Sequence, residues 1–282
     1  MTYKRISYYS ETQGPATITT ADQLIIEVGT QHVACMVKST VSNQVESFEL
    51  FQPDHKDKDW AAIFIEISAF SQLINKSYSN THIYYNFPEA LIIPESKFTM
   101  ASGKAYLDQV YGENNRDPFA YETLSANISM VCVFQVNKNL GDTMRQRFPS
   151  HRSSHVYSSF LNSLFARALP QDSFTSIRFY SGHFIIAVFK DKKLQLIQSF
   201  HYETDEDILY NLLNIIRQFE LNPDYSVVEI SGEFDKSSPM AQQLPDLFGK
   251  INWDNCGEEG IFKTILGKQP AHFFTPYYKL VV

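Results

Sequence analysis

One order of secondary structure is predicted twice along this chain of 282 residues, and this repetition constrains the fold more than any single motif does. In the first half, three short runs rich in β-branched and aromatic residues are separated by glycine and polar residues. Such runs are typical of a three-stranded meander, here at Leu24–Val28, Val33–Val37 and Val45–Phe51. An amphipathic helix of about 15 residues is predicted from Trp60, followed by a strand at His82–Phe87.

The same order returns after residue 172. Three further strands are predicted at Phe174–Tyr180, His183–Phe189 and Leu194–Tyr202. Thr204 then starts a capping box with an acidic first turn, which predicts a second helix, and a strand follows at Val227–Ile230. The sequence therefore predicts an α/β protein of two similar domains, residues 1–150 and 151–282. Each domain has a mixed sheet that opens with an antiparallel meander and is flanked by helices.

Two local similarities support an internal duplication. Ser47-Phe48 matches Ser199-Phe200 in the third strand of each copy, and both Gly29 and Gly182 lie at the first strand turn. The alternative is that two unrelated α+β units share the same order of elements.

Charge and composition exclude several classes of function. The chain has 24 basic and 31 acidic residues, a net charge of −7, so it lacks the basic surface needed to neutralise many phosphates, and nucleic acid is not expected as a partner. The polar first twenty residues predict no signal peptide, and the longest apolar stretch, Phe184–Phe189, is too short for membrane insertion. The three cysteines are scattered without C-x-x-C spacing, which favours buried thiols and a cytoplasmic protein: Cys35, Cys132 and Cys256.

Several segments of the chain together resemble a bacterial family of uncharacterised proteins assigned to the actin-like ATPase superfamily. They lie at 88–94, 184–200, 205–210 and 228–232, and the resemblance extends from about residue 20 to the end. It implies two ribonuclease H-like domains in tandem, which in this superfamily hold a nucleotide between them.

The resemblance also implies where phosphate would be held. In nucleotide-binding relatives the first turn of each domain carries a D-x-G pattern, in which glycine admits phosphate to the backbone amides and the carboxylate positions magnesium. Here the first turn reads Glu27-Val28-Gly29-Thr30, so glycine and hydroxyl are kept but the acid is one methylene longer. Tyr180 precedes Ser181-Gly182 in the second turn, and we expect this tyrosine to stand where the carboxylate would be.

A third element in such relatives is a glycine-rich loop that packs against adenosine. Its counterpart here is Ser231-Gly232 followed by Glu233, a single glycine that is more typical of a turn ending a strand. The candidate cofactor-binding residues are therefore Glu27, Gly29, Thr30, Ser181, Gly182, Ser231 and Gly232. No catalytic residue and no metal ligand is predicted.

Because the nucleotide motifs are degenerate, the sequence favours a non-catalytic scaffold that binds a protein partner and no cofactor. The alternative is an ATPase or phosphotransferase that binds ATP with magnesium in the interdomain cleft. A third hypothesis, small-ligand sensing in that cleft, stays open.

Other patterns favour ordinary structural roles. His151 and His155 have the spacing of a metal pair, but Pro149 places His151 before the helix expected at 155–168, and no further ligand is adjacent. Arg178 stands on the strand where a ribonuclease H nuclease needs an acid, which argues against that activity. The charged segment 54–59 is predicted to be a solvated loop that caps the following helix. The aromatic segment 271–282 is predicted to pack as a final strand or helix, with a partner-docking tail as the alternative.

Overall fold

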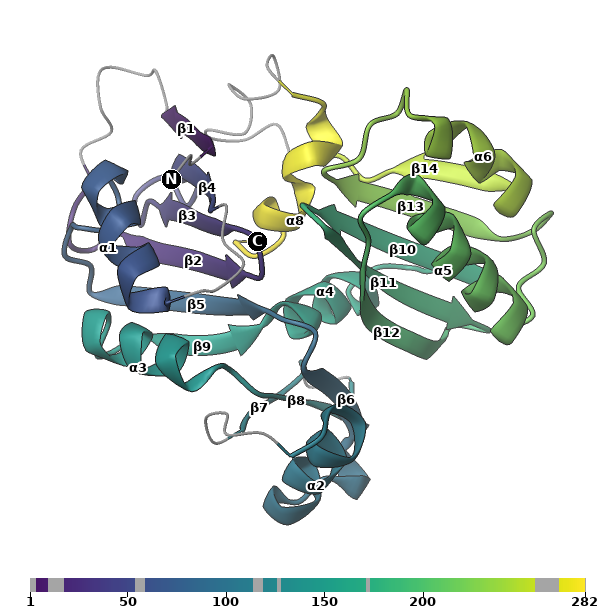
Figure 1. Ribbon diagram of the computed structural model, residues 1–282, viewed down its shortest axis with the longest axis horizontal. Helices are drawn as coiled ribbons and strands as arrows, with labels where there is room; N and C mark the ends of the chain where they lie inside the picture. The colour runs from purple at the N-terminus through teal and green to yellow at the C-terminus, as the bar shows by residue number, and fades with distance from the viewer. Residues whose placement is uncertain are drawn as a thin grey trace. The chain divides into compact units, whose positions relative to one another are not determined.

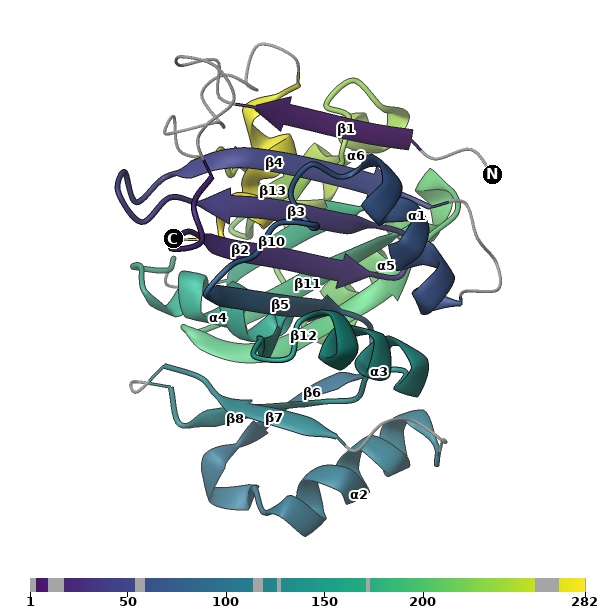
Figure 2. The ribbon, with the colours of Figure 1, turned by 90° about the vertical axis from the view of Figure 1, so that its left-hand side faces the viewer.

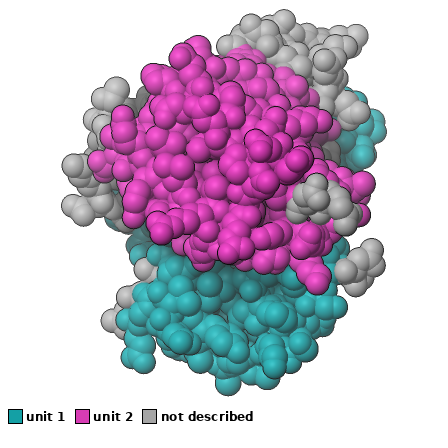
Figure 3. All heavy atoms as spheres, turned by 90° about the vertical axis from the view of Figure 1, so that its right-hand side faces the viewer, with its two compact units in different colours: residues 1–162, 258–267, 280–282 teal, residues 163–257, 268–279 magenta. Residues whose placement is uncertain are grey.

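The structure, a computed structural model, describes residues 4–9, 18–53, 59–113, 119–125, 128–170, 173–256 and 269–281. These residues form two compact units (Figure 3). The described part of the first unit comprises residues up to 162 with 280–281, and that of the second comprises 163–256 with 269–279. No described helix has both the length and the apolar character needed to cross a bilayer. All three cysteines are buried thiols, as their scattered spacing predicted.

The first unit is built on a six-stranded sheet with the order β1-β4-β3-β2-β5-β9 (Figure 2). Its strands are β1 (Lys4–Tyr9), β2 (Gln23–Gly29), β3 (Val33–Lys38), β4 (Val45–Gln52), β5 (Asn80–Asn86) and β9 (Arg152–His155). The predicted meander, β2 to β4, is confirmed. β1 pairs with the outer edge of β4, and β9 pairs with β5; neither strand was predicted.

The helix that follows the meander, α1 (Trp60–Phe70), is shorter than predicted. Asp59 caps its start by accepting a hydrogen bond from the backbone of Ala61, whereas residues 54–58 lie outside the described part of the chain. Ser71 ends the helix because its hydroxyl donates to the buried carboxylate of Glu49, at 2.5 Å. A second helix of this unit is α3 (Lys138–Arg147), which Asn137 caps by accepting hydrogen bonds from the backbone amides of Asn139 and Leu140.

A small subdomain is inserted between β5 and β9 (Figure 1). It contains a three-stranded antiparallel sheet of order β6-β8-β7, with two helical segments: β6 (Ala90–Pro94), η1 (Glu95–Lys97), α2 (Met100–Tyr111), β7 (Ala120–Thr123) and β8 (Met130–Phe134). Leu107 of α2 packs on Val131 and Val133 of β8. Helix α2 was not predicted, since it buries just Gly103 and Leu107 and so carries little apolar periodicity.

The second unit is built on a five-stranded sheet with the order β12-β11-β10-β13-β14. Its strands are β10 (Ser173–Tyr180), β11 (His183–Lys190), β12 (Lys193–His201), β13 (Val227–Gly232) and β14 (Lys250–Trp253). The helices α5 (Asp205–Gln218) and α6 (Pro239–Leu247) cover one face of this sheet and bury its core. The capping box at Thr204 is confirmed. The C-terminal segment packs as helix, with η2 (Ala271–Phe274) and α8 (Thr275–Tyr278) burying Phe274 and Tyr277.

The two sheets share one strand order and one set of strand directions. β4-β3-β2-β5-β9 and β12-β11-β10-β13-β14 are each paired antiparallel, antiparallel, parallel and parallel. The strand registers also show which residues of the two sheets are equivalent. In the first sheet Val33 pairs with Val28 on one side and Phe51 on the other. In the second sheet Phe184 pairs in the same way with Phe179 and Phe200. Phe200 is therefore equivalent to Phe51, and the sequence match of Ser47-Phe48 with Ser199-Phe200 is wrong.

The helix predicted to begin at His155 begins one residue later, as α4 (Val156–Phe165), because His155 ends β9. The ring of His155 is buried, and both of its nitrogens are used: Nε2 donates to the Phe87 carbonyl at 2.9 Å, and Nδ1 accepts from the Tyr157 amide at 3.2 Å. Burial lowers the pKa of His155 to about 3. Within the described residues, no group of three or more potential ligands could hold a metal ion.

This buried histidine makes the first unit sensitive to acid. The unfolded chain takes up a proton on His155 near pH 6.5, whereas the folded chain does so only near pH 3, so protonation favours unfolding between these values. We expect His155 to lower the free energy of unfolding by about 2 kcal/mol between pH 7 and pH 5. Urea unfolding at both pH values should show that His155→Gln loses this part of the pH dependence. The matched variant His201→Gln, at a residue that is exposed, should keep all of it. An unchanged pH dependence in His155→Gln would contradict the assignment.

Candidate functional site

The first turn predicted to hold phosphate lies between β2 and β3, at Thr30 and Gln31. The acid that precedes it, Glu27, is fully buried. Its Oε1 accepts a hydrogen bond from Nε2 of His32 at 2.9 Å and another from Nδ2 of Asn86 at 2.7 Å. Asn86 reaches Glu27 because β5 runs parallel to β2 and ends beside Gly29. The carboxylate is thus held by two side chains from its own unit.

The His32 ring lies directly on Gly29. A Cβ atom added to this glycine would come within 2.2 Å of Cε1 of His32. The Gly29 amide donates to the His32 carbonyl at 2.9 Å, which closes the hairpin. The space above the glycine, which a phosphate would need, is therefore filled by an imidazole.

The second turn, Ser181 and Gly182 between β10 and β11, has the same length as the first. Counting back from each turn along the ladders, Glu27 pairs with Ala34 and Arg178 pairs with Ile185. Arg178 is therefore the counterpart of Glu27, and Tyr180 is the counterpart of Gly29. The expectation that Tyr180 takes the carboxylate position is corrected: a buried arginine takes it, and the tyrosine replaces the glycine.

Aromatic side chains pack around this second turn. Tyr180 is buried and stacks on His183 at 4.9 Å between ring centroids, and the ring of Tyr277 from α8 meets it edge-on at 6.1 Å. Tyr202 closes the turn from the side, since its hydroxyl donates to the Tyr180 carbonyl and its amide donates to the Gly182 carbonyl. Gly182 has a φ of +73°, which suits the turn.

The third predicted element, Ser231 and Gly232 at the end of β13, lies against β10. Gly232 has a φ of +91°, and a Cβ atom there would come within 1.9 Å of the Phe179 carbonyl oxygen. The hydroxyl of Ser231 is buried and donates to the Ile177 carbonyl at 3.4 Å. Phe234 then packs on Phe179 at 4.5 Å between ring centroids. Glycine is required here by the close approach of two strands, as expected of a turn that ends a strand.

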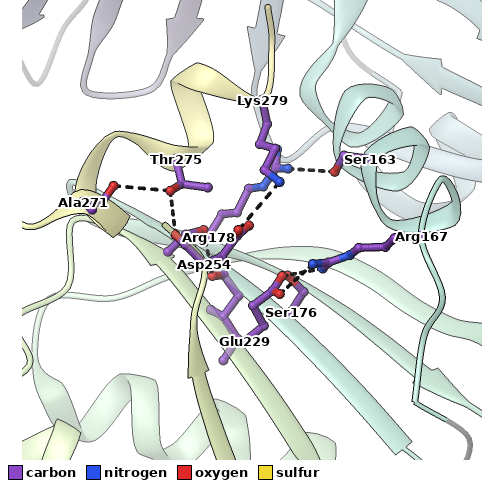
Figure 4. Close-up of polar contacts among 11 residues, drawn as sticks. Ser163, Arg167, Ser176, Arg178, Glu229, Asp254, Ala271, Thr275 and Lys279 are labelled. Atoms are coloured by element: carbon purple, nitrogen blue, oxygen red, sulfur yellow. Dashed lines mark hydrogen bonds and ion pairs between the residues drawn. The ribbon is translucent and has the colours of Figure 1, made fainter. Parts of the chain in front are cut away.

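Arg178 belongs to a cluster of charged side chains on the face of the second sheet opposite α5 and α6 (Figure 4). The cluster joins β10 and β13 to the segments that follow α4, β14 and α8. Its three cationic and two anionic residues are Arg167, Arg178, Lys279, Glu229 and Asp254.

The contacts within this cluster are specific. Arg167 binds Glu229 through both terminal nitrogens, at 2.7 and 2.5 Å. Lys279 lies 3.6 Å from Asp254, and Arg178 donates to Ser163 at 3.1 Å. Burial and the nearby charge of Glu229 raise the pKa of Asp254, whereas the three cations oppose this shift.

The arrangement pairs its acids with cations instead of presenting them to a metal. The predicted residues do not form one constellation within either unit: Glu27, Gly29 and Thr30 belong to the first unit, and the serines and glycines belong to the second. Sequence reasoning missed His32 and Asn86, the two partners of Glu27. One signal was available, since a histidine follows the first turn of both meanders, at His32 and His183.

Comparison with known proteins identifies a protein family that matches this chain and solved structures that share its fold. The family described as protein of unknown function DUF3822 matches residues 13–251. No curated protein matches the chain.

Two solved structures are similar over almost the whole chain. One is a protein of Bacteroides thetaiotaomicron with an actin-like ATPase fold and unknown function; it is 16% identical with a TM-score of 0.78, covering 93% of this chain and 96% of that one. The other is the PilM–PilN complex of type IV pilus biogenesis, 11% identical with a TM-score of 0.57, covering 93% and 97%. The chain therefore has the actin-like ATPase fold, with ribonuclease H-like domains, as the resemblance implied.

Proposed function

The chain belongs to the DUF3822 family and has the actin-like ATPase fold, and from this premise we propose that it is a non-catalytic, partner-binding protein whose nucleotide site has decayed. We place it in the cytoplasm, in keeping with its buried thiols. The partner is a protein, and no cofactor takes part.

The observation that carries this proposal is the closed state of the first turn. A turn that grips phosphate needs open backbone amides and a carboxylate that can reach magnesium through water. Here the His32 ring covers Gly29, and Glu27 is buried with Oε1 held by His32 and Asn86. At the corresponding position of the second unit, Arg178 carries the charge opposite to the one that magnesium requires.

A structural neighbour supports the partner-binding part of the proposal. PilM, which is similar in fold to this chain, is seen in a complex with PilN. A scaffold of this fold can thus hold a protein partner, although the two chains share too little sequence for a partner to be transferred.

Titration with Mg-ATP tests the proposal. We expect no heat of binding by calorimetry and no thermal shift at millimolar Mg-ATP, because the nucleotide would have to displace a buried, hydrogen-bonded histidine. Micromolar binding that disappears in Glu27→Gln would contradict the proposal. Glu27→Gln is a better test variant than a bulky substitution of Gly29, because any side chain at position 29 collides with His32 even without nucleotide.

One observation favours the second candidate, an ATPase or phosphotransferase. Oε2 of Glu27 is buried and has no hydrogen-bond partner in the described part of the chain. An ion or a water-bound magnesium could use this oxygen if His32 moved aside. His32→Ala separates the candidates: tight Mg-ATP binding by this variant alone would mark a decayed site blocked by one side chain, whereas binding by the natural chain would favour the enzyme.

A further inference from the structure

A cavity of about 570 Å³ lies in the first unit, at the end of the sheet opposite the β2–β3 turn. It is formed where the segment before β5 meets the segment before β9, and these two parallel strands start side by side. The cavity is lined by residues 74–79 with Thr81 and by residues 147–151. Its volume falls in the range of pockets that bind small molecules.

The cavity is lined by cationic and hydroxyl side chains. Lys76, Arg147 and His151 contribute to its wall, and no aspartate or glutamate is among its described lining residues. None of these three side chains forms an ion pair with a carboxylate in the described part of the chain. The neighbouring helix α3 shows the usual alternative, because its exposed Lys138 is paired with Asp142 at 3.0 Å. A positive site with no acidic partner among the residues that the structure describes is unexpected in a chain with a net charge of −7.

Local contacts fix two of these side chains. The guanidinium of Arg147 lies over the Phe64 ring, 5.9 Å from its centroid, and donates to the hydroxyl of Ser68. Nδ1 of His151 donates to the Phe148 carbonyl at 2.5 Å, which holds this ring in place at the wall. A group held in place before binding loses less conformational entropy when a ligand arrives.

Positive charges near the cavity also affect a neighbouring histidine. His82, on β5, has its pKa lowered to about 4 by burial and then by the charges of Arg152 and His151. This effect agrees with the charge of the cavity wall and does not depend on any ligand.

We propose that this cavity binds a small molecule through its phosphate group, with Lys76 and Arg147 as the ligand-binding cations. The planar guanidinium suits phosphate oxygens in pairs, and the ammonium adds a compact charge. Ser77, Ser79 and Thr81 supply hydroxyls at the same wall. The cavity is larger than a phosphate alone requires, which leaves room for the rest of a small organic molecule. The site is separate from Glu27 and does not rest on the proposed function.

Calorimetric titration with inorganic pyrophosphate at constant ionic strength tests this inference. We expect saturable binding by the natural chain, and at least tenfold weaker binding by Lys76→Ala. The Lys76 side chain is exposed, so its removal should leave the fold unchanged. Arg147→Lys keeps the charge but loses the paired donors, so it should also weaken binding. The matched control Lys138→Ala removes the same charge from the same unit and should change the affinity by less than twofold.

Three outcomes would overturn the inference. They are the absence of binding by the natural chain, equal weakening in Lys76→Ala and Lys138→Ala, and loss of binding in Glu27→Gln. The last would place pyrophosphate at the β2–β3 turn and would contradict the proposed decay of that site as well, whereas the first two leave that proposal standing.

Discussion

Replacing Gly232 by alanine is expected to lower the free energy of unfolding of the second unit by about 4 kcal/mol. Two costs add at this position. A φ of +91° disfavours any residue with a Cβ atom, and the added atom would come within 1.9 Å of the Phe179 carbonyl oxygen. Since both partners are backbone, β10 and β13 would have to separate, and their parallel ladder would be lost at its end.

The chain offers a matched control for this variant. Gly112, after α2, has a φ of +79°, but a Cβ atom added there would meet no other atom within 4 Å, so Gly112→Ala should cost only about 1 kcal/mol. Each unit contains one of the two tryptophans, Trp60 and Trp253, so Trp60→Phe leaves a fluorescence probe for the second unit alone. Urea unfolding followed at Trp253 measures the effect of Gly232→Ala, and unfolding followed at Trp60 in a Trp253→Phe background measures that of Gly112→Ala. A cost for Gly232→Ala no greater than for Gly112→Ala would show that the strands do not approach this closely.

Replacing Arg167 by methionine is expected to cost the second unit about 3 kcal/mol. The guanidinium binds both oxygens of Glu229, whose side chain is 10% exposed. Its loss leaves a mostly buried carboxylate that, within the described part of the chain, keeps only the hydroxyl of Ser176 as donor. The exposed Arg217 on α5 provides the control, and Arg217→Met should change stability by less than about 0.5 kcal/mol.

A double-mutant cycle separates the pair from its surroundings. Because a buried ion pair is costly to break but less costly to replace as a whole, adding Glu229→Met to Arg167→Met should restore at least half of the lost stability. Additive losses in the double variant would show that the two side chains do not stabilise the fold as a pair. The stability of each variant is again measured by urea unfolding, followed by the fluorescence of Trp253.

The repeated meanders could be predicted because their strands are short, apolar and bounded by glycine or polar turns. β10 and β11 bury almost every side chain, so the local composition alone specifies them. Other elements depend on contacts with distant parts of the chain. The four residues of β9, Arg152 to His155, are polar and become a strand only because β5 is available as a parallel partner.

The candidate site was predictable only in part. Glu27 and Gly29 are recognised from their spacing, but the closure of the turn depends on where the hairpin register places His32. The second turn was misaligned because Gly29 was matched to Gly182 by residue type, whereas the ladders match it to Tyr180.

The charged cluster of the second unit had no signal in the sequence. Arg167, Glu229 and Asp254 come from three separate segments, and no spacing relates them. Only the folded sheet brings these side chains to one face.

A crystal structure of the natural chain grown with millimolar Mg-ATP would test the central claim most directly. We predict that the His32 ring stays on Gly29, that Glu27 keeps its hydrogen bonds to His32 and Asn86, and that no nucleotide density lies at this turn. Density for magnesium and a triphosphate beside Glu27, with His32 displaced, would contradict the account.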